Sequence, residues 1–159
     1  MPNRRSSDTP GRGLPAEDGA PAGASSRGLP WELPHTFLGL DEAASDLSAS
    51  RAVVLPVPYE TTTSYGGGTR YGPGAILEAS RYVELFDQEL GCEASTVGVH
   101  TLPSLELTRA GPGAAAKELE KAFGTLLAEL GDRFPITLGG EHSISAPLVR
   151  AVAAHVGQR

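Results

Sequence analysis

Cysteine, aromatic residues and long hydrophobic runs are all scarce in this sequence of 159 residues. Cys92 is the single cysteine, so the chain forms no intramolecular disulfide, and such usage is typical of a reducing compartment. No apolar run approaches the roughly 18 residues that a membrane-spanning helix requires. Arg4 and Arg5 are followed by polar residues rather than by the apolar segment of an export signal. The sequence therefore predicts a cytoplasmic protein that does not bind membranes.

An excess of positive charge is also missing. The chain has 13 Lys and Arg against 19 Asp and Glu, which gives a formal net charge of −6 at pH 7. An acidic surface repels the phosphates of nucleic acids and of anionic lipids. The composition therefore predicts that nucleic acid is not a partner of this protein.

Three common catalytic or cofactor-binding motifs are absent as well. The glycines between Gly66 and Gly74 lack the spacing of a phosphate-binding P-loop, and Tyr71 stands where a dinucleotide fingerprint needs its third glycine. Ser143 is not in a nucleophile elbow, because Glu141 occupies the position of the first glycine of that motif. The sequence therefore does not favour a nucleotide-binding protein or a serine hydrolase.

Glycine and proline, in contrast, are abundant, and many of them lie at the N-terminus. Residues 1–30 include 18 Gly, Pro, Ser or Ala and almost no branched aliphatic residues. Such a segment cannot bury enough apolar surface to offset the entropy that ordering costs. We expect residues 1–30 to form a disordered tail and residues 31–159 to form one folded domain.

Within that domain, short apolar runs alternate with segments of helical periodicity. The run Ala-Val-Val-Leu after Arg51 is continuous and β-branched, which is typical of a strand buried on both faces of a parallel sheet. Strands that alternate with helices indicate βαβ units. The expected strands cover 52–57, 95–100 and 134–138, the expected helices cover 73–85, 112–130 and 145–154, and an irregular apolar arm covers 31–40.

The segment Leu-Gly-Gly-Glu-His-Ser at 138–143 carries the clearest chemical signal. It follows a predicted buried strand directly, and ligands bind at the carboxyl ends of strands in open parallel sheets. Two glycines allow the backbone to turn sharply and present His142, with Glu141 beside it. From these residues alone, His142 has three possible roles: a metal ligand, a general base, or a hydrogen-bonded residue that stabilises the turn.

The connection from residue 59 to residue 74 is a second candidate region. It is longer than a plain link between a strand and a helix, and long ordered loops are often functional. Tyr65, Thr69 and Arg70 are candidates for lining a substrate entrance, because the loop leaves the same edge of the sheet. The alternative is a loop packed by its own side chains.

Two blocks of the sequence together resemble the agmatinase branch of the arginase and agmatinase family of ureohydrolases. The first begins with Pro-Val-Pro-Tyr-Glu-Thr-Thr-Thr-Ser-Tyr at 56–65 and continues through Gly-Thr-Arg-Tyr-Gly-Pro-Gly-Ala-Ile at 68–76. The second is Leu-Gly-Gly-Glu-His-Ser-Ile at 138–144. The order of the blocks, with two predicted βα units between them, makes the resemblance specific over about residues 35–155.

The resemblance implies an arginase-like fold, a three-layer α/β/α sandwich around a parallel sheet. It also implies a binuclear Mn²⁺ centre that hydrolyses a guanidino group, as in the conversion of agmatine to putrescine and urea. His142 falls on the first metal-ligand histidine of the family, and Glu141 is implied as a group that orients His142 or its surroundings. A metal-bound hydroxide suits this reaction, because a guanidinium carbon is a poor electrophile. The implied partners are a small cationic guanidino substrate and, in the full-length enzyme, identical subunits.

The sequence departs from the family pattern after the second block. The remaining metal ligands are expected in an Asp-Ala-His-x-Asp block and a later Asp-x-Asp block, and neither occurs in these 159 residues. We therefore expect residues 31–159 to be the N-terminal half of the fold, truncated after about three βα units and inactive alone. Alternative functions are another guanidino-hydrolase, such as a guanidinobutyrase or an arginase-like enzyme, and a non-catalytic α/β module for binding or assembly.

Overall fold

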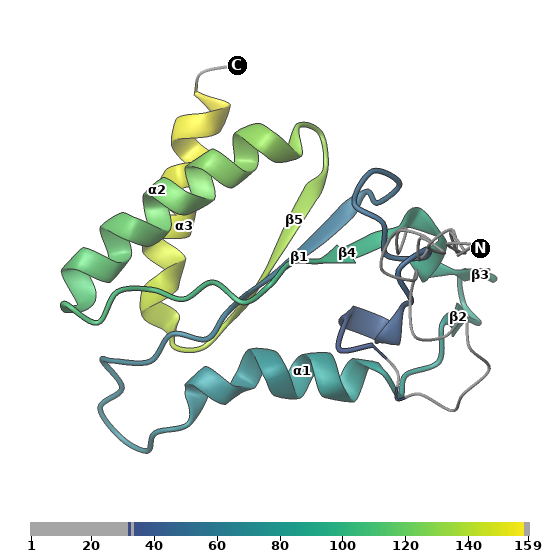
Figure 1. Ribbon diagram of the computed structural model, residues 1–159, viewed down its shortest axis with the longest axis horizontal. Helices are drawn as coiled ribbons and strands as arrows, with labels where there is room; N and C mark the ends of the chain where they lie inside the picture. The colour runs from purple at the N-terminus through teal and green to yellow at the C-terminus, as the bar shows by residue number, and fades with distance from the viewer. Residues whose placement is uncertain (1–31, 33, 158–159) are drawn as a thin grey trace, which may run out of the picture. The chain divides into compact units, whose positions relative to one another are not determined.

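The computed structural model describes residue 32 and residues 34–157 (Figure 1). The predicted tail, residues 1–30, lies outside the described residues. The described part contains a parallel sheet, three α-helices, a small antiparallel hairpin and short 3₁₀ turns. The strands are β1 (Ala52–Val57), β2 (Phe86–Asp87), β3 (Cys92–Glu93), β4 (Val99–Thr101) and β5 (Phe134–Gly139), and the helices are α1 (Gly72–Ser80), α2 (Pro112–Leu130) and α3 (Ser145–Val156).

The parallel sheet has the strand order β4-β1-β5, and helices cover both of its faces. Alternating residues of β1 separate the two cores. Leu55 and Val57 pack with residues of α2 and α3, whereas Val54 packs with Leu77 of α1. Figure 1 shows α1 on one side of the sheet and the α2 and α3 pair on the other. The predicted three-layer α/β/α architecture with a parallel sheet is confirmed.

Strand β1 lies at the centre of the sheet and has the range predicted from its apolar run. It pairs with β4 from Ala52 and with β5 along its whole length. Pro56 cannot donate a hydrogen bond, yet it occupies this central strand. The carbonyl of Pro56 accepts from the N–H of Leu105, on the β4 side, where β4 has already ended at Thr101. The proline therefore lies where the sheet requires no further donor.

Helix α2 also has the predicted range. Pro112 occupies its first turn, and Gly131 follows its last residue with a φ of 62°. These positions suit the two residues, because proline lacks the N–H that a first turn leaves unpaired and glycine tolerates positive φ. The buried face repeats every three or four residues, as an amphipathic helix requires. Its members are Ala115, Leu119, Phe123, Leu127 and Leu130.

The helix predicted over 73–85 ends at Ser80, so its last turn was wrong. The hydroxyl of Ser80 donates to the Leu77 carbonyl and accepts from the N–H of Leu38, which anchors the helix end to the N-terminal arm. Tyr82 and Val83 beyond it are 76% and 55% exposed. No buried face therefore holds a further helical turn.

The strand predicted over 95–100 was wrong in its first half. Residues Ala94–Val97 form a 3₁₀ turn, and β4 begins only at Val99. Gly98 separates the two with a φ of 76°, and a Cβ at this position would lie 2.7 Å from the Ala49 carbonyl oxygen. The close approach of the two backbones at Gly98 marks the point where the 3₁₀ turn ends and the strand begins. Strand β5 and helix α3 match their predictions within two residues, whereas the β2 and β3 hairpin was not predicted.

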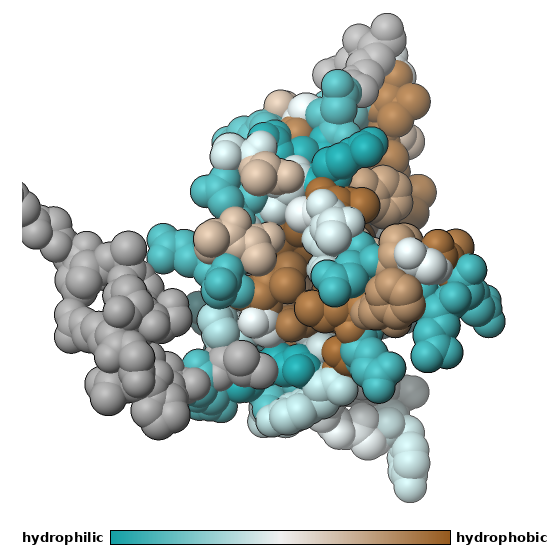
Figure 2. Space-filling view, turned by 90° about the vertical axis from the view of Figure 1, so that its right-hand side faces the viewer, coloured by the Kyte–Doolittle hydropathy of each residue, from teal (hydrophilic) through white to brown (hydrophobic). Residues whose placement is uncertain are grey.

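Strand β5 lies at an edge of the sheet in the described part of the chain. Figure 2 shows hydrophobic side chains gathered in the middle of the view and beside the C-terminal end of α3. The exposed apolar residues of β5 and α3 are Phe134, Ile136, Val149, Val152 and Val156. An unpaired strand edge flanked by apolar side chains favours association with another polypeptide segment.

Candidate functional site

The site predicted from the sequence lies at the carboxyl edge of the sheet, between the ends of β1 and β5. The chain leaving β1 crosses to the face covered by α1, whereas the chain leaving β5 enters α3 on the opposite face (Figure 1). Neighbouring strands whose connections diverge in this way leave a crevice at their carboxyl ends, which is where α/β sheets bind ligands.

Backbone contacts join the two connections at the base of this crevice. The N–H of Gly140 donates to the Val57 carbonyl at 3.0 Å, and the N–H of Glu141 donates to the Tyr59 carbonyl at 2.9 Å. A Cβ at Gly140 would lie 2.2 Å from that same Tyr59 oxygen. Glycine is therefore required at position 140, because the backbone of the connection after β1 passes too close for any side chain.

Glu141 is buried and anchors the connection after β1 to the connection after β5. One oxygen of its carboxylate accepts the N–H groups of Thr61 and Thr62, each at 2.8 Å. The other oxygen accepts the hydroxyls of Thr62 at 2.7 Å and Ser143 at 2.5 Å. All four donors point at one carboxylate, so the group is fully satisfied although water is largely excluded from it.

The charge state of Glu141 follows from these contacts. Burial alone would raise the pKa of its carboxyl group. The hydrogen bonds from Ser143, Thr62 and Thr61 favour the ionised form and outweigh burial, so the pKa falls to about 2. Glu141 is therefore an anion throughout the neutral pH range. Its hydrogen-bond partners are Thr61, Thr62 and Ser143, so the carboxylate faces the loop after β1.

His142 is exposed and opens the 3₁₀ turn His142–Ile144 that leads into α3. Its Nδ1 lies 3.2 Å from the hydroxyl of Ser145. This contact leaves Nε2 as the nitrogen available to a ligand. The imidazole lines a hollow of about 280 Å³ together with Thr137, Gly139 and Leu148.

Two residues with metal-ligating side chains, Glu141 and His142, line this hollow, and the Glu141 carboxylate already accepts four hydrogen bonds. Within residue 32 and residues 34–157, no three His, Cys, Asp or Glu side chains come together in a way that could hold a metal ion. His100 lies opposite Val53 in the sheet, with its Nδ1 2.7 Å from the Ser45 carbonyl. His155 lies at the other end of α3, roughly 20 Å along the helix from His142. These residues alone do not fit a binuclear metal centre.

Of the three predicted loop candidates, Thr69 and Arg70 share one 3₁₀ turn, whereas Tyr65 lies at the tip of the loop. Tyr65 is 98% exposed at the tip of the loop, and Thr69 begins a 3₁₀ turn that continues to Tyr71. The guanidinium of Arg70 lies 5.0 Å from the centroid of the Tyr71 ring and donates to its hydroxyl at 3.1 Å. Arg70 lines a hollow of about 450 Å³ on the β4 side of the loop, with Tyr59 among its other lining residues.

Glu60 is a residue of this region that the sequence reasoning missed. Its carboxylate accepts the N–H of Gly68, 2.9 Å from each oxygen, and the N–H of Arg70 at 3.0 Å. These backbone bonds from Arg70 and Gly68 lower the pKa of Glu60. The run Gly66-Gly67-Gly68 was the available signal, because successive N–H groups in a glycine-rich turn form a nest for an anion. Here the anion is a side chain of the same loop.

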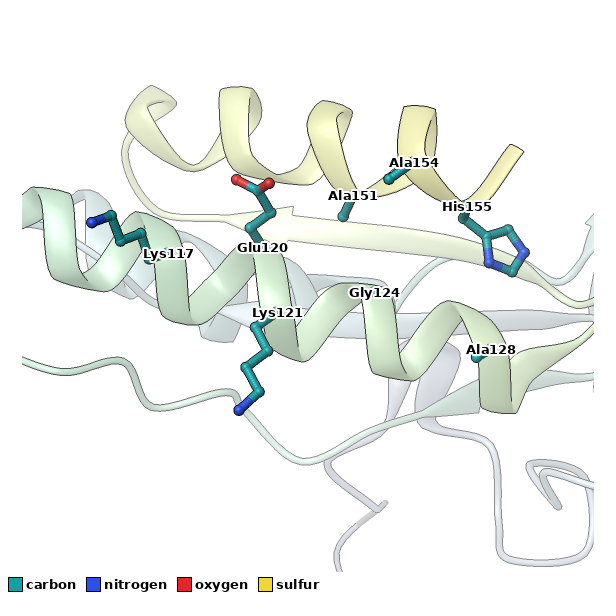
Figure 3. Close-up of a pocket in the computed structure, with 8 residues that line it drawn as sticks. All are labelled: Lys117, Glu120, Lys121, Gly124, Ala128, Ala151, Ala154 and His155. Atoms are coloured by element: carbon teal, nitrogen blue, oxygen red, sulfur yellow. The ribbon is translucent and has the colours of Figure 1, made fainter. Parts of the chain in front are cut away.

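A separate groove runs between α2 and α3 (Figure 3). Its volume is about 480 Å³, and small residues line its floor, including Gly124, Ala128 and Ala151. On its rim, Glu120 accepts a hydrogen bond from Arg150 at 2.7 Å. Small residues between two helices, with an ion pair at the edge, are typical of helix packing rather than of a ligand site. The crevice at the carboxyl edge of the sheet therefore remains the candidate site.

Comparison with known proteins shows what this chain is similar to. The model of the arginase family matches residues 50–159. An N(1)-aminopropylagmatine ureohydrolase from Synechocystis sp. is 36% identical over 122 residues, covering 75% of this chain and 40% of its own length. An agmatinase from Bacillus cereus is 32% identical over 104 residues, covering 65% of this chain and 35% of its own.

A solved structure shows the same fold. The agmatine ureohydrolase of Thermoplasma volcanium superimposes with a TM-score of 0.59 at 27% identity, covering 69% of this chain and 37% of that one. The chain thus spans well under half the length of the relatives it matches. Separately, in the described part of the chain, no helix is both long enough and apolar enough to cross a membrane.

Proposed function

The chain belongs to the arginase family, and we propose that it contributes the first part of an agmatinase-like ureohydrolase site, which hydrolyses a guanidino group. The observation that carries this proposal is the position of His142. The family match includes the Gly-Gly-Glu-His-Ser segment, and the fold presents that histidine beside a hollow at the carboxyl edge, with Nε2 available. The reaction would release urea and an amine, such as putrescine from agmatine.

We propose Mn²⁺ as the metal of this enzyme. Imidazole nitrogen and carboxylate oxygen are ligands that Mn²⁺ accepts, and His142 would supply one of them. One imidazole cannot hold two metal ions, and among the described residues no three His, Cys, Asp or Glu side chains come together in a way that could hold one. We therefore expect the 159-residue chain, assayed by itself with Mn²⁺, to release no urea.

The proposed substrate is a small, linear, cationic guanidino compound. Support comes from the net charge of −6 and from the relatives' names. We favour aminopropylagmatine over agmatine as the substrate, because the relative named for it is 36% identical to this chain and the agmatinase is 32% identical. Alternative enzyme functions are a guanidinobutyrase or an arginase-like activity. We also propose that the enzyme is cytoplasmic, in keeping with the single cysteine. We further propose that it forms homo-oligomers.

A chimera tests the proposal against a non-catalytic role in binding or assembly. Residues 50–157 would replace the aligned segment of the Synechocystis relative, which provides the rest of the fold. Urea release would be measured with Mn²⁺ and, in turn, aminopropylagmatine, agmatine, 4-guanidinobutyrate and arginine. We expect release from the first two substrates. A folded chimera that releases no urea from any of them would support the non-catalytic module instead.

A further inference from the structure

Two carboxylates hold the loop after β1 at its two ends. Glu141 accepts the N–H groups of Thr61 and Thr62, where the loop begins. Glu60 accepts the N–H groups of Gly68 and Arg70, where the loop approaches α1. Between these anchors the tip projects into solvent, with Tyr65 almost fully exposed.

The backbone from Gly67 to Arg70 is shaped around the Glu60 carboxylate. Gly68 has a φ of 119°, a conformation that residues with a side chain rarely adopt. A Cβ at Gly67 would lie 2.9 Å from one Glu60 oxygen. The glycines therefore allow the N–H groups to converge on the carboxylate, and Glu60 neutralises the positive end of this nest from within the chain.

We propose that Glu60 is a positioning residue, whose carboxylate fixes the Gly68–Arg70 backbone and thereby holds Arg70 and the loop tip in one preformed arrangement beside the hollow that Glu60 and Arg70 both line. Without Glu60, residues 63–70 would be held only by the Thr61 and Thr62 anchor and by the start of α1. The loop would then have to be ordered when a ligand binds, which costs binding free energy. The role of Glu60 in ligand binding rests on the proposed function, whereas its anchoring of the Gly68–Arg70 backbone does not.

Amide hydrogen exchange in the 159-residue chain tests the anchoring directly. In Glu60→Gln one oxygen that accepts from Gly68 becomes an NH₂ group and the negative charge is lost, so the remaining acceptor is weaker and we expect exchange at Gly68 and Arg70 to quicken about tenfold. Exchange at Thr61 and Thr62 should stay unchanged, because Glu141 holds these amides. Gly67→Ala perturbs the same carboxylate by a different route and should give the same pattern.

Glu106→Gln is the matched control, since Glu106 lines the same hollow as Glu60 and loses the same charge. Its carboxylate contacts Arg109 at 4.0 Å, and the side chain is 88% exposed. We expect this variant to exchange like the unmodified chain. Unchanged exchange at Gly68 and Arg70 in both Glu60→Gln and Gly67→Ala would overturn the proposal, whatever the enzyme does.

The chimera described above tests the positioning role. Glu60→Gln should raise KM for the guanidino substrate by about tenfold and leave kcat within about twofold, because the loop would have to be ordered before the reaction. Quickened exchange with an unchanged KM would leave Glu60 as a purely structural anchor and overturn the positioning role. If the parent chimera is folded but inactive, the proposed function fails, and the exchange data still decide the anchoring.

Discussion

Glu141 accepts two hydrogen bonds from Thr62, one from its N–H at 2.8 Å and one from its hydroxyl at 2.7 Å. The two residues are 79 positions apart in the sequence, and this pair joins the connections after β1 and β5. The candidate site is therefore organised by an anion that lies beneath it, while His142 is presented at the surface.

Removal of the Glu141 carboxylate should destabilise the fold. Glu141→Ala removes a buried acceptor from the N–H groups of Thr61 and Thr62 and from two hydroxyls, which costs about 3 kcal/mol. Urea unfolding followed by circular dichroism measures this loss. The exposed Glu93 is the control, and Glu93→Ala should change the free energy of unfolding by less than about 0.5 kcal/mol. Equal effects of the two substitutions would contradict the anchoring role of Glu141.

The same carboxylate predicts a loss of stability in acid. Its pKa in the folded chain is about 2, below the ordinary value of 4.5, so the folded state binds the proton less readily than the unfolded state. The stabilisation is present in full above about pH 5 and is lost as the pH falls toward 2. It amounts to about 3 kcal/mol from a single group. Unfolding midpoints measured between pH 2 and 6 should decline less steeply in Glu141→Gln. If the unfolding midpoints of the two proteins fall equally with pH, the Glu141 carboxylate is not the source of the acid sensitivity.

Two glycine substitutions should have opposite effects. Gly140→Ala places a Cβ 2.2 Å from the Tyr59 carbonyl oxygen, so the crevice must deform, at a cost of about 3 kcal/mol or more. Gly124→Ala introduces a Cβ in the middle of α2 with nothing within 4 Å, and alanine is the better helix former by about 1 kcal/mol. Thermal unfolding should show a lower Tm for the first variant and a higher Tm for the second. A tolerated Gly140→Ala would mean that the two connections are not in close contact.

The exposed edge of β5 should make the 159-residue chain self-associate. Phe134 is 70% exposed on this edge strand, and a charged side chain at such a position blocks pairing between sheets. Sedimentation of the unmodified chain should show an apparent mass that rises with concentration, whereas Phe134→Lys should stay closer to the monomer. Similar behaviour of both proteins at every concentration would show that this edge does not drive association.

Much of the fold was predictable because its signals are local. The proline and glycine that bound α2 and the β-branched run of β1 act within a few residues, and both ranges were predicted correctly. The position of His142 was predictable for the same reason, since two glycines follow a buried strand. The overlong helix prediction failed at Ser80 because the end of α1 is fixed by Leu38, which is distant in the sequence.

The organisation of the site was less accessible from the sequence. Two of the partners of Glu141, Thr61 and Thr62, are 80 and 79 residues away, and no periodicity links them to it. The role of Glu60 depends on backbone conformations at Gly67 and Gly68, which set the directions of N–H groups rather than of side chains. The residue types alone did not show that a glutamate of the same loop accepts the N–H groups of this turn.

The most direct test of the central claim is Mn²⁺-dependent urea release from the chimera with and without His142. Substitution His142→Asn keeps a polar side chain but removes the imidazole ring, which lines the hollow. If His142 is a metal ligand of a guanidino-hydrolase, the parent chimera will release urea from aminopropylagmatine or agmatine, and the His142→Asn variant will bind less Mn²⁺ and fall to background. Equal Mn²⁺ binding and equal urea release in the two folded proteins would contradict that role.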